Sequence, residues 1–197
     1  MNKTVIGLTG TTGAGKSTIS IEFAKNGFNV IDCDKVAKFV VENDNCIINK
    51  LCNSFGNDII NKDGLLDRRL LASRAFADEE STKTLNTITL PAIVKCIAEQ
   101  IDNCDESLIL LDAPTLFESG ANKLCSAIVG IICDDEIRKE RIMLRDNLTE
   151  NQAYIRMSAQ KSNDFFKENC TYIIENDSTV ADLIEKAQSV IDKILKG

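Results

Sequence analysis

Residues 10–17 are GTTGAGKS, a complete G-x-x-x-x-G-K-[S/T] phosphate-binding loop. An apolar run at residues 5–8 precedes it and a helical pattern begins at Lys16, which is the strand-before, helix-after context that the motif requires. The glycines let backbone N–H groups turn inward, the helix adds its positive end, and the lysine reaches the β- and γ-phosphates. We therefore expect phosphate groups at this loop, with the hydroxyl of Ser17 available to Mg²⁺.

Outward from the loop, strand and helix patterns alternate, which predicts an α/β fold: a three-layer sandwich around a five-stranded parallel sheet. Helices are expected to end near Gly27, to begin with a capping box at Thr149 and Gln152, and to close the chain at residues 179–195. The last helix has a core-facing side, formed by Val180, Leu183, Ile184, Ala187, Val190, Ile191 and Ile194. Strands are expected at residues 5–9, 28–31, 107–111, 127–132 and 172–174.

The middle of the chain has helical patterns and no convincing core strand. Ile47, Leu51 and Phe55 share one helical face, Asp67 can cap a helix, and Pro91 is expected at the first position of another. We expect a nucleotide-binding core at residues 1–45 and 105–197, with a helical lid at about 135–162. Residues 46–104 are then an inserted helical lobe.

Composition restricts the function classes. A net charge of −7 disfavours nucleic-acid binding, and no apolar run is long enough to cross a membrane. The N-terminus lacks the features of a secretory signal, so we expect a cytoplasmic protein, and we expect a monomer. The eight cysteines contain no C-x-x-C pair and there is no histidine, so they are expected as reduced, mostly buried thiols. Any general base must be a carboxylate, lysine, tyrosine or thiol.

Carboxylates follow two of the expected strands: Asp32 and Asp34 after the second, Asp112 after the third. Because ligands of an open parallel sheet lie beyond the carboxyl ends of its strands, these groups should meet the phosphate-binding loop at one edge. The alternative is that each aspartate only caps the next helix.

Arginines recur along the expected lid, at Arg138, Arg141 and Arg145 of one helix and at Arg156 of the next. In a phosphate-binding protein, such guanidinium groups would close over the nucleotide and stabilise the charge of phosphoryl transfer. The alternative is a solvated face paired with Glu136 and Glu140.

Together these segments resemble the dephospho-coenzyme A kinase family over nearly the whole chain. The resemblance is carried by the loop with Thr18, the D-C-D segment at 32–34, D-G-L-L-D-R-R at 63–69, D-A-P-T-L-F-E at 112–118, Arg141 with Arg145-Asp146, Gln160, and I-I-E-N at 173–176. Where the family usually has His-Pro, this chain has Leu90-Pro91.

The resemblance implies transfer of the γ-phosphate of Mg·ATP to the ribose 3′-hydroxyl of dephospho-coenzyme A, with these roles for individual residues. Asp34 would be the base, and Arg141 and Arg145 would be lid contacts. The acceptor would be received by the helical lobe at residues 46–104, with contacts from Arg68, Arg69, Asp112 and Asp34. Residues for ATP would be Gly13, Ala14, Gly15, Lys16, Ser17, Thr18 and, on the adenine side, Asn176.

Three other functions are alternatives to this one. The nearest is a nucleoside-monophosphate kinase or another small-metabolite kinase of the same fold, which the aspartate pair after the second strand disfavours. A GTPase switch lacks its Asn-Lys-x-Asp segment here, and an adaptor with a decayed loop is disfavoured because Lys16 and Ser17 are both intact.

Overall fold

The computed structural model describes residues 3–196, which form two compact units. The first unit contains the described residues up to Ile31, the segment Asp105–Leu116 and the chain from Asn122 onward. The second contains Asp32–Cys104 and Phe117–Ala121. The helical middle of the chain is thus a unit of its own, and it begins with the helix that follows the second strand. The roles expected for the two parts stay predictions.

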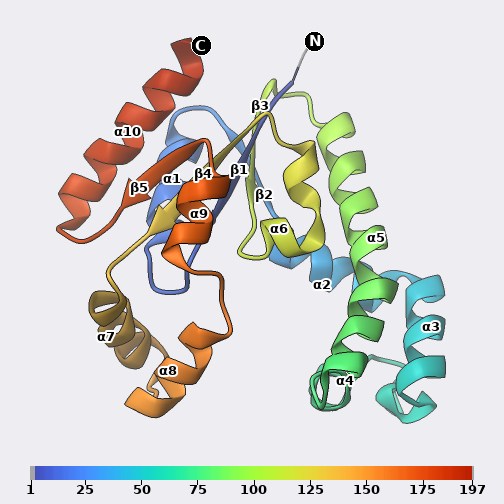
Figure 1. Ribbon diagram of the computed structural model, residues 1–197. Helices are drawn as coiled ribbons and strands as arrows, with labels where there is room; N and C mark the ends of the chain where they lie inside the picture. The colour runs from blue at the N-terminus through green and yellow to red at the C-terminus, as the bar shows by residue number, and fades with distance from the viewer. Residues whose placement is uncertain (1–2, 197) are drawn as a thin grey trace. The chain divides into compact units, whose positions relative to one another are not determined.

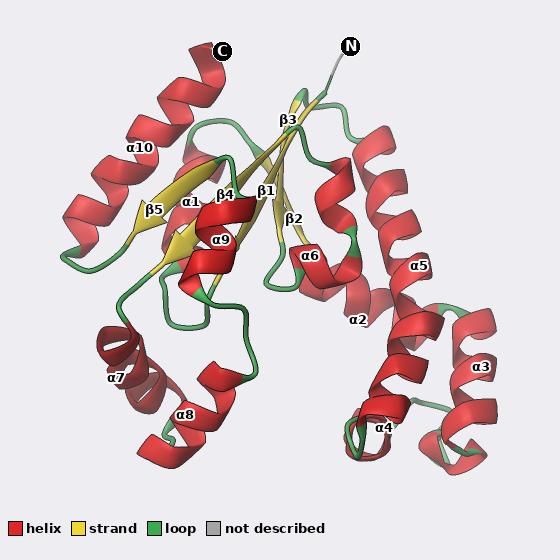
Figure 2. Ribbon diagram, in the orientation of Figure 1, coloured by secondary structure: helices red, strands yellow, loops and turns green. Residues whose placement is uncertain are grey.

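A sheet of five strands forms the centre of the first unit, in the order β2-β3-β1-β4-β5 (Figures 1 and 2). Strand β1 pairs in parallel with β3 and β4, and β4 pairs in parallel with β5. The expected α/β fold is confirmed, and every expected strand is present with ends that differ by at most one residue. The strands are β1 (Thr4–Gly10), β2 (Asn29–Asp32), β3 (Leu108–Asp112), β4 (Ala127–Ile132) and β5 (Tyr172–Glu175).

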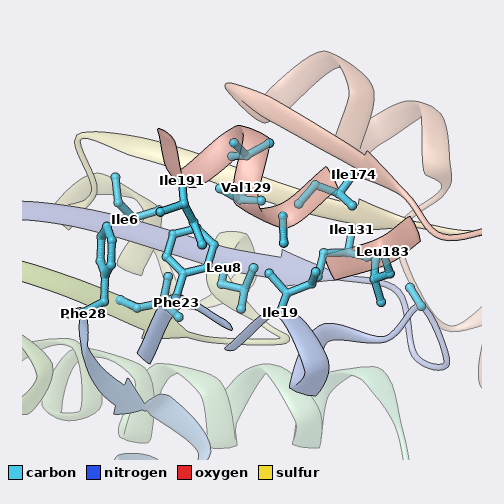
Figure 3. Packing of buried hydrophobic residues seen from close by; sticks show 14 of the residues in the cluster. Ile6, Leu8, Ile19, Phe23, Phe28, Val129, Ile131, Ile174, Leu183 and Ile191 are labelled. Atoms are coloured by element: carbon cyan, nitrogen blue, oxygen red, sulfur yellow. The ribbon is translucent and has the colours of Figure 1, made fainter. Parts of the chain in front are cut away.

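Both faces of this sheet are covered, which is why its strands are continuous apolar runs. On one face, Ile6 and Leu8 of β1 pack with Phe23 of α1 (Lys16–Lys25) and Ile191 of α10 (Val180–Lys196), as Figure 3 shows. On the other, α9 (Asn163–Asn169) packs against β4. The first unit is therefore a helix–sheet–helix sandwich, with the main core between the sheet and the pair α1 and α10.

Most helices begin after a residue whose side chain accepts a hydrogen bond from a first-turn N–H group, as such ends require. The capping box of Thr149 and Gln152 is present, and Asp67 caps its helix, as predicted. The capped helices are α2 (Cys33–Asn43), α3 (Asn45–Phe55), α4 (Arg68–Ala75), α5 (Glu79–Asn103), α7 (Asp135–Asp146), α8 (Glu150–Ser158) and α9. The shorter elements are η1 (Asn57–Ile59), α6 (Leu116–Ser119) and η2 (Ala121–Leu124).

The helix start expected at Pro91 is wrong, because Pro91 lies inside α5, which begins after the cap Asp78. A proline inside a helix removes one backbone hydrogen bond and costs about 3 kcal/mol. Helix α5 continues across it because Ile93, Ile97 and Ile101 are buried and the helix packs against α2, α3 and α4. Packing within the second unit thus outweighs a local stop signal.

Other expectations need smaller corrections. Val180 is 63% exposed, because it is the first residue of α10 and the buried side of this helix begins only at Leu183. All eight cysteines are free thiols as expected, but Cys33 and Cys133 are the buried ones and Cys46 is exposed. Within residues 3–196, no helix is both long and apolar enough to cross a bilayer.

Candidate active site

The phosphate-binding loop runs from β1 to α1 and needs glycine at its close approaches. Gly10 has a φ of 153°, and a Cβ there would lie 2.3 Å from the carbonyl oxygen of Ile131 in β4. Gly15 has a φ of 95°, and a Cβ there would lie 2.5 Å from Nδ2 of Asn176. Only glycine tolerates both the backbone angle and the lack of space. The loop is therefore held against the ends of β4 and β5.

The N-terminus of α1 differs from those of the capped helices. Gly15 occupies its N-cap position, and within the described residues no side chain caps it and no acidic residue lies in its first turn. The orphan N–H groups of a helix start carry a partial positive charge, and they are stabilised by an anion when no capping side chain is present. This end of α1 is built to receive an anionic ligand.

Lys16, the first residue of α1, forms an ion pair with Asp112, the last residue of β3. Both side chains are largely buried, with 19% and 16% exposed. The parallel pairing of β1 with β3 brings these two residues to the same edge of the sheet. The prediction that Asp112 lies beside the phosphate-binding loop is confirmed.

A cleft of about 700 Å³ opens over this loop. Its walls come from the loop, from Pro114 after β3, and from helices α7 and α8, the segment expected to be a lid, all within the first unit. Arg141, Leu144, Arg145 and Arg156 are the residues of these two helices that line it. A cleft with a helix start, a lysine and three arginines on its walls is strongly complementary to a polyphosphate.

The lid arginines are held in different ways. Arg145 donates two hydrogen bonds of 2.8 Å to Asp146, and Arg156 forms an ion pair with the same carboxylate. The bonds from Arg145 hold the pKa of the Asp146 carboxyl below its usual range. Arg138, in contrast, is buried, pairs with Asp135 and does not line the cleft. The expected stripe of arginines is thus divided between the cleft and the interior.

Three side chains hold the loop in place. Nδ2 of Asn176 donates to the carbonyl of Ala14 at 2.8 Å, and Arg141 donates to the carbonyls of Asn176 and Gly13 at 3.1 and 3.5 Å. Oε1 of Gln160 accepts from the backbone N–H of Thr12 at 3.0 Å. The loop conformation is therefore fixed by residues far along the chain.

Comparison with known proteins gives the family. The model of a family described as dephospho-CoA kinase matches residues 4–182. This chain belongs to the dephospho-CoA kinase family. A dephospho-CoA kinase from Fusobacterium nucleatum is 34% identical over 194 residues, covering 98% of this chain and 100% of that protein. The kinase class and the dephospho-CoA kinase assignment expected from the motifs are confirmed.

Solved structures agree with this dephospho-CoA kinase assignment. The protein TT1252 from Thermus thermophilus has a TM-score of 0.86 at 28% identity, and the match covers 100% of both chains. The dephospho-CoA kinase from Campylobacter jejuni has a TM-score of 0.67 at 26% identity, and the match covers 99% of both chains. The chain therefore has the fold of these two solved structures, the second of which is a dephospho-CoA kinase.

The remaining residues expected to act in a dephospho-CoA kinase lie in the second unit. Asp34 is exposed in the first turn of α2, directly after its cap Asp32. Arg68 begins α4 and lies 3.7 Å from Glu42, and Arg69 is exposed beside it. Their part in acceptor binding stays a prediction.

Some features of this dephospho-CoA kinase site were not foreseen from its sequence. The bond between Gln160 and Thr12 joins residues that the motif does not connect. Leu144 also lines the cleft, although the sequence pattern indicates only its arginine neighbours. The amide of Asn176 faces the loop carbonyl of Ala14, whereas the sequence suggested the adenine side. The spacing of Arg156 and Gln160, four residues apart, was the one local signal that both face the loop.

Proposed function

We propose that this chain transfers the γ-phosphoryl group of ATP to the ribose 3′-hydroxyl of dephospho-coenzyme A, the last step of coenzyme A biosynthesis. Family membership supports the reaction. The observation that carries the donor side is the uncapped N-terminus of α1, which begins with Lys16 in a cleft lined by three arginines. A cytoplasmic location and a monomeric state are part of the same proposal.

On the donor side, the loop and Lys16 hold the phosphates. Backbone N–H groups of Gly13 and Gly15 supply neutral donors, and Lys16 supplies charge at the β- and γ-phosphates. The N–H groups of Ala14 and Thr18 donate to the carbonyls of Thr11 and Gly15, so these two residues shape the loop. Arg141 and Arg145 stabilise the negative charge that spreads over the equatorial oxygens during transfer. One charge-assisted hydrogen bond contributes about 1.5–3 kcal/mol, so two arginines can account for a large part of the rate.

Mg²⁺ is the metal that the donor set fits. The hydroxyl of Ser17 lies exposed in the first turn of α1 and lines the cleft, and a neutral hydroxyl is the hard oxygen ligand that Mg²⁺ accepts beside phosphate oxygens. Ser17 is therefore the residue assigned to the metal. Bound with ATP, Mg²⁺ neutralises charge on the β- and γ-phosphates.

Asp34 is assigned as the base on the acceptor side. A carboxylate is too weak a base to remove an alcohol proton early, but the loose transition state of phosphoryl transfer does not require early removal. Asp34 orients the 3′-hydroxyl and accepts its proton late. Its place in the first turn of a capped helix gives its backbone a fixed position.

The remaining residues are assigned to recognition. Arg68, Arg69 and Asp112 bind the acceptor, with the two arginines suited to its phosphate groups. Asn176 is assigned to the adenine side of ATP. Its amide bonds to Ala14 and its carbonyl accepts from Arg141, so its contribution on that side is to hold the loop.

A coupled ADP-release assay tests the proposal. Dephospho-coenzyme A is compared as acceptor with AMP, dTMP and gluconate, and the product is identified by mass. The expected result is rapid ADP release with dephospho-coenzyme A and formation of coenzyme A. Faster release with one of the other three acceptors would favour the alternative, another small-metabolite or nucleoside-monophosphate kinase.

A further inference from the structure

We propose that Gln160 is a positioning residue that couples the lid to the apex of the phosphate-binding loop. Its Oε1 accepts a hydrogen bond of 3.0 Å from the backbone N–H of Thr12, although the two residues lie 148 positions apart. The inference rests on the proposed function only in requiring that the cleft binds ATP.

The bond at Thr12 differs from its neighbours in the loop. Thr11 donates its N–H to the carbonyl of Ile131 in β4 at 3.3 Å, and Ala14 donates to the carbonyl of Thr11 at 3.1 Å. Those acceptors belong to the sheet and to the loop itself. The acceptor for the N–H of Thr12 is a side chain that follows α8. The orientation of the peptide group at Thr12 therefore depends on the position of α8.

Gln160 is firmly attached to α8. Its backbone N–H donates to the carbonyl of Met157 at 3.1 Å, and Ala159 between the helix and Gln160 keeps a helical backbone. Arg156 lies four residues earlier, which puts it on the same side of this segment, and it lines the cleft. Any shift of α8 that moves Arg156 toward a phosphate therefore also moves the acceptor of Thr12.

The chemistry of the side chain suits this position. A carboxamide oxygen accepts a backbone hydrogen bond without bringing charge, whereas a glutamate would accept the same bond and repel the phosphates of the cleft. A methionine has nearly the same length and is only a weak acceptor. These two replacements separate the hydrogen bond from the charge.

The experiment measures the affinity of the full-length protein for a non-hydrolysable ATP analogue with Mg²⁺, by calorimetric titration. Loss of one neutral hydrogen bond lowers an equilibrium constant by up to about tenfold, so Gln160→Met should weaken binding by roughly three- to tenfold. Gln160→Glu should bind more weakly than the wild type in low salt, and this deficit relative to the wild type should shrink in high salt, because salt screens the added charge. Asn151→Ala, at an exposed position in the first turn of α8, is the control and should leave the affinity unchanged.

A double-mutant cycle with Arg156→Ala distinguishes coupling from simple support of the loop. If Gln160 transmits the position of α8, the double variant should bind clearly more tightly than the product of the two single effects predicts. Multiplying effects, or a Gln160→Met variant that binds like the wild type, would overturn the inference. If the methionine variant does not fold, Gln160→Glu decides: a loss of affinity that salt does not restore contradicts the proposal, and recovery supports it.

Failure of this inference is separable from failure of the proposed function. The binding assay contains no acceptor, so it does not depend on dephospho-coenzyme A. A wild-type protein that binds the analogue but releases no ADP with dephospho-coenzyme A would refute the proposed function. The double-mutant cycle would then still decide the role of Gln160.

Discussion

The starts of α1 and α2 follow consecutive strands of the chain but are completed in opposite ways. Helix α2 begins after Asp32, whose carboxylate accepts from the N–H of Lys35 at 3.0 Å, and Asp34 adds a second negative charge in its first turn. Helix α1 begins after Gly15 and, within the described residues, has neither a capping side chain nor an acidic first turn.

This difference separates two tasks that a kinase must perform. The end of α2 is neutralised by the protein itself, and its second aspartate, Asp34, is the proposed base. The end of α1 is left to the substrate, so its positive partial charge contributes to binding instead of to folding. Substitutions at the two ends should accordingly affect different quantities.

The largest effect is expected at Asp34. Replacing Asp34 by alanine should lower kcat at least about a hundredfold and leave ATP affinity nearly unchanged, because the base is lost while the donor side is intact. Steady-state kinetics with both substrates checks this. Asp44→Ala, which removes a capping carboxylate of α3 in the same unit, is the control and should keep its kcat. Turnover near the wild-type level in Asp34→Ala would remove Asp34 from the mechanism.

At the start of α1, replacing Lys16 by alanine should weaken ATP binding and lower kcat together. The loss of one charge-assisted contact corresponds to roughly ten- to a hundredfold in affinity. Titration with ATP and Mg²⁺ measures it. Lys25, in the last turn of the same helix and paired with Glu22, is the matched control, and Lys25→Ala should bind ATP normally. An unchanged affinity in Lys16→Ala would contradict the donor-side assignment.

The third effect concerns stability. Asp32→Ala removes the cap of α2 and should lower the free energy of unfolding by about 1 kcal/mol, measured by urea denaturation. Asp32→Asn keeps an acceptor at the cap and should lose less. Equal losses in both variants would show that the capping hydrogen bond is not what stabilises this helix start.

The smallest effect is a dependence on pH. Partial burial works to raise the pKa of the Asp32 carboxyl, but hydrogen bonds from Lys35 outweigh it and hold the pKa below the usual value of 3.8. A depressed pKa adds stability above 3.8 that is lost as pH falls through the folded value. The stability difference between the wild type and Asp32→Asn should therefore shrink on acidification below about pH 4. A difference that stays constant from pH 6 to pH 3 would rule out this contribution.

Local signals in the sequence were enough for the sheet and the loop. The strands are short apolar runs bounded by polar residues, and the loop motif carries its own context. Helix α2 was missed because the segment at 32–34 marks the end of a strand and the helix starts with no gap after it. Helix α9 has only seven residues, too few to show a period. The helix start predicted at Pro91 is wrong because a local rule takes no account of packing against α2, α3 and α4.

The contacts behind the loop were beyond any local pattern. Asn176 and Gln160 reach Ala14 and Thr12 across 162 and 148 positions, and no periodicity links such partners. The family resemblance includes both residues, but only the fold shows which loop atoms they bond to. The proximity of Lys16 and Asp112 is predictable because the carboxyl ends of parallel strands lie at one edge of a sheet.

The pairing of Lys16 with Asp112 should disfavour small anions at the loop. A phosphate oxygen binds the lysine in competition with a carboxylate of the protein, so it gains less there than it would at an unpaired lysine. A lone orthophosphate has few other contacts to compensate, while a triphosphate meets the loop amides, the helix end and the guanidinium groups at once. We therefore expect this ion pair to favour longer polyphosphates.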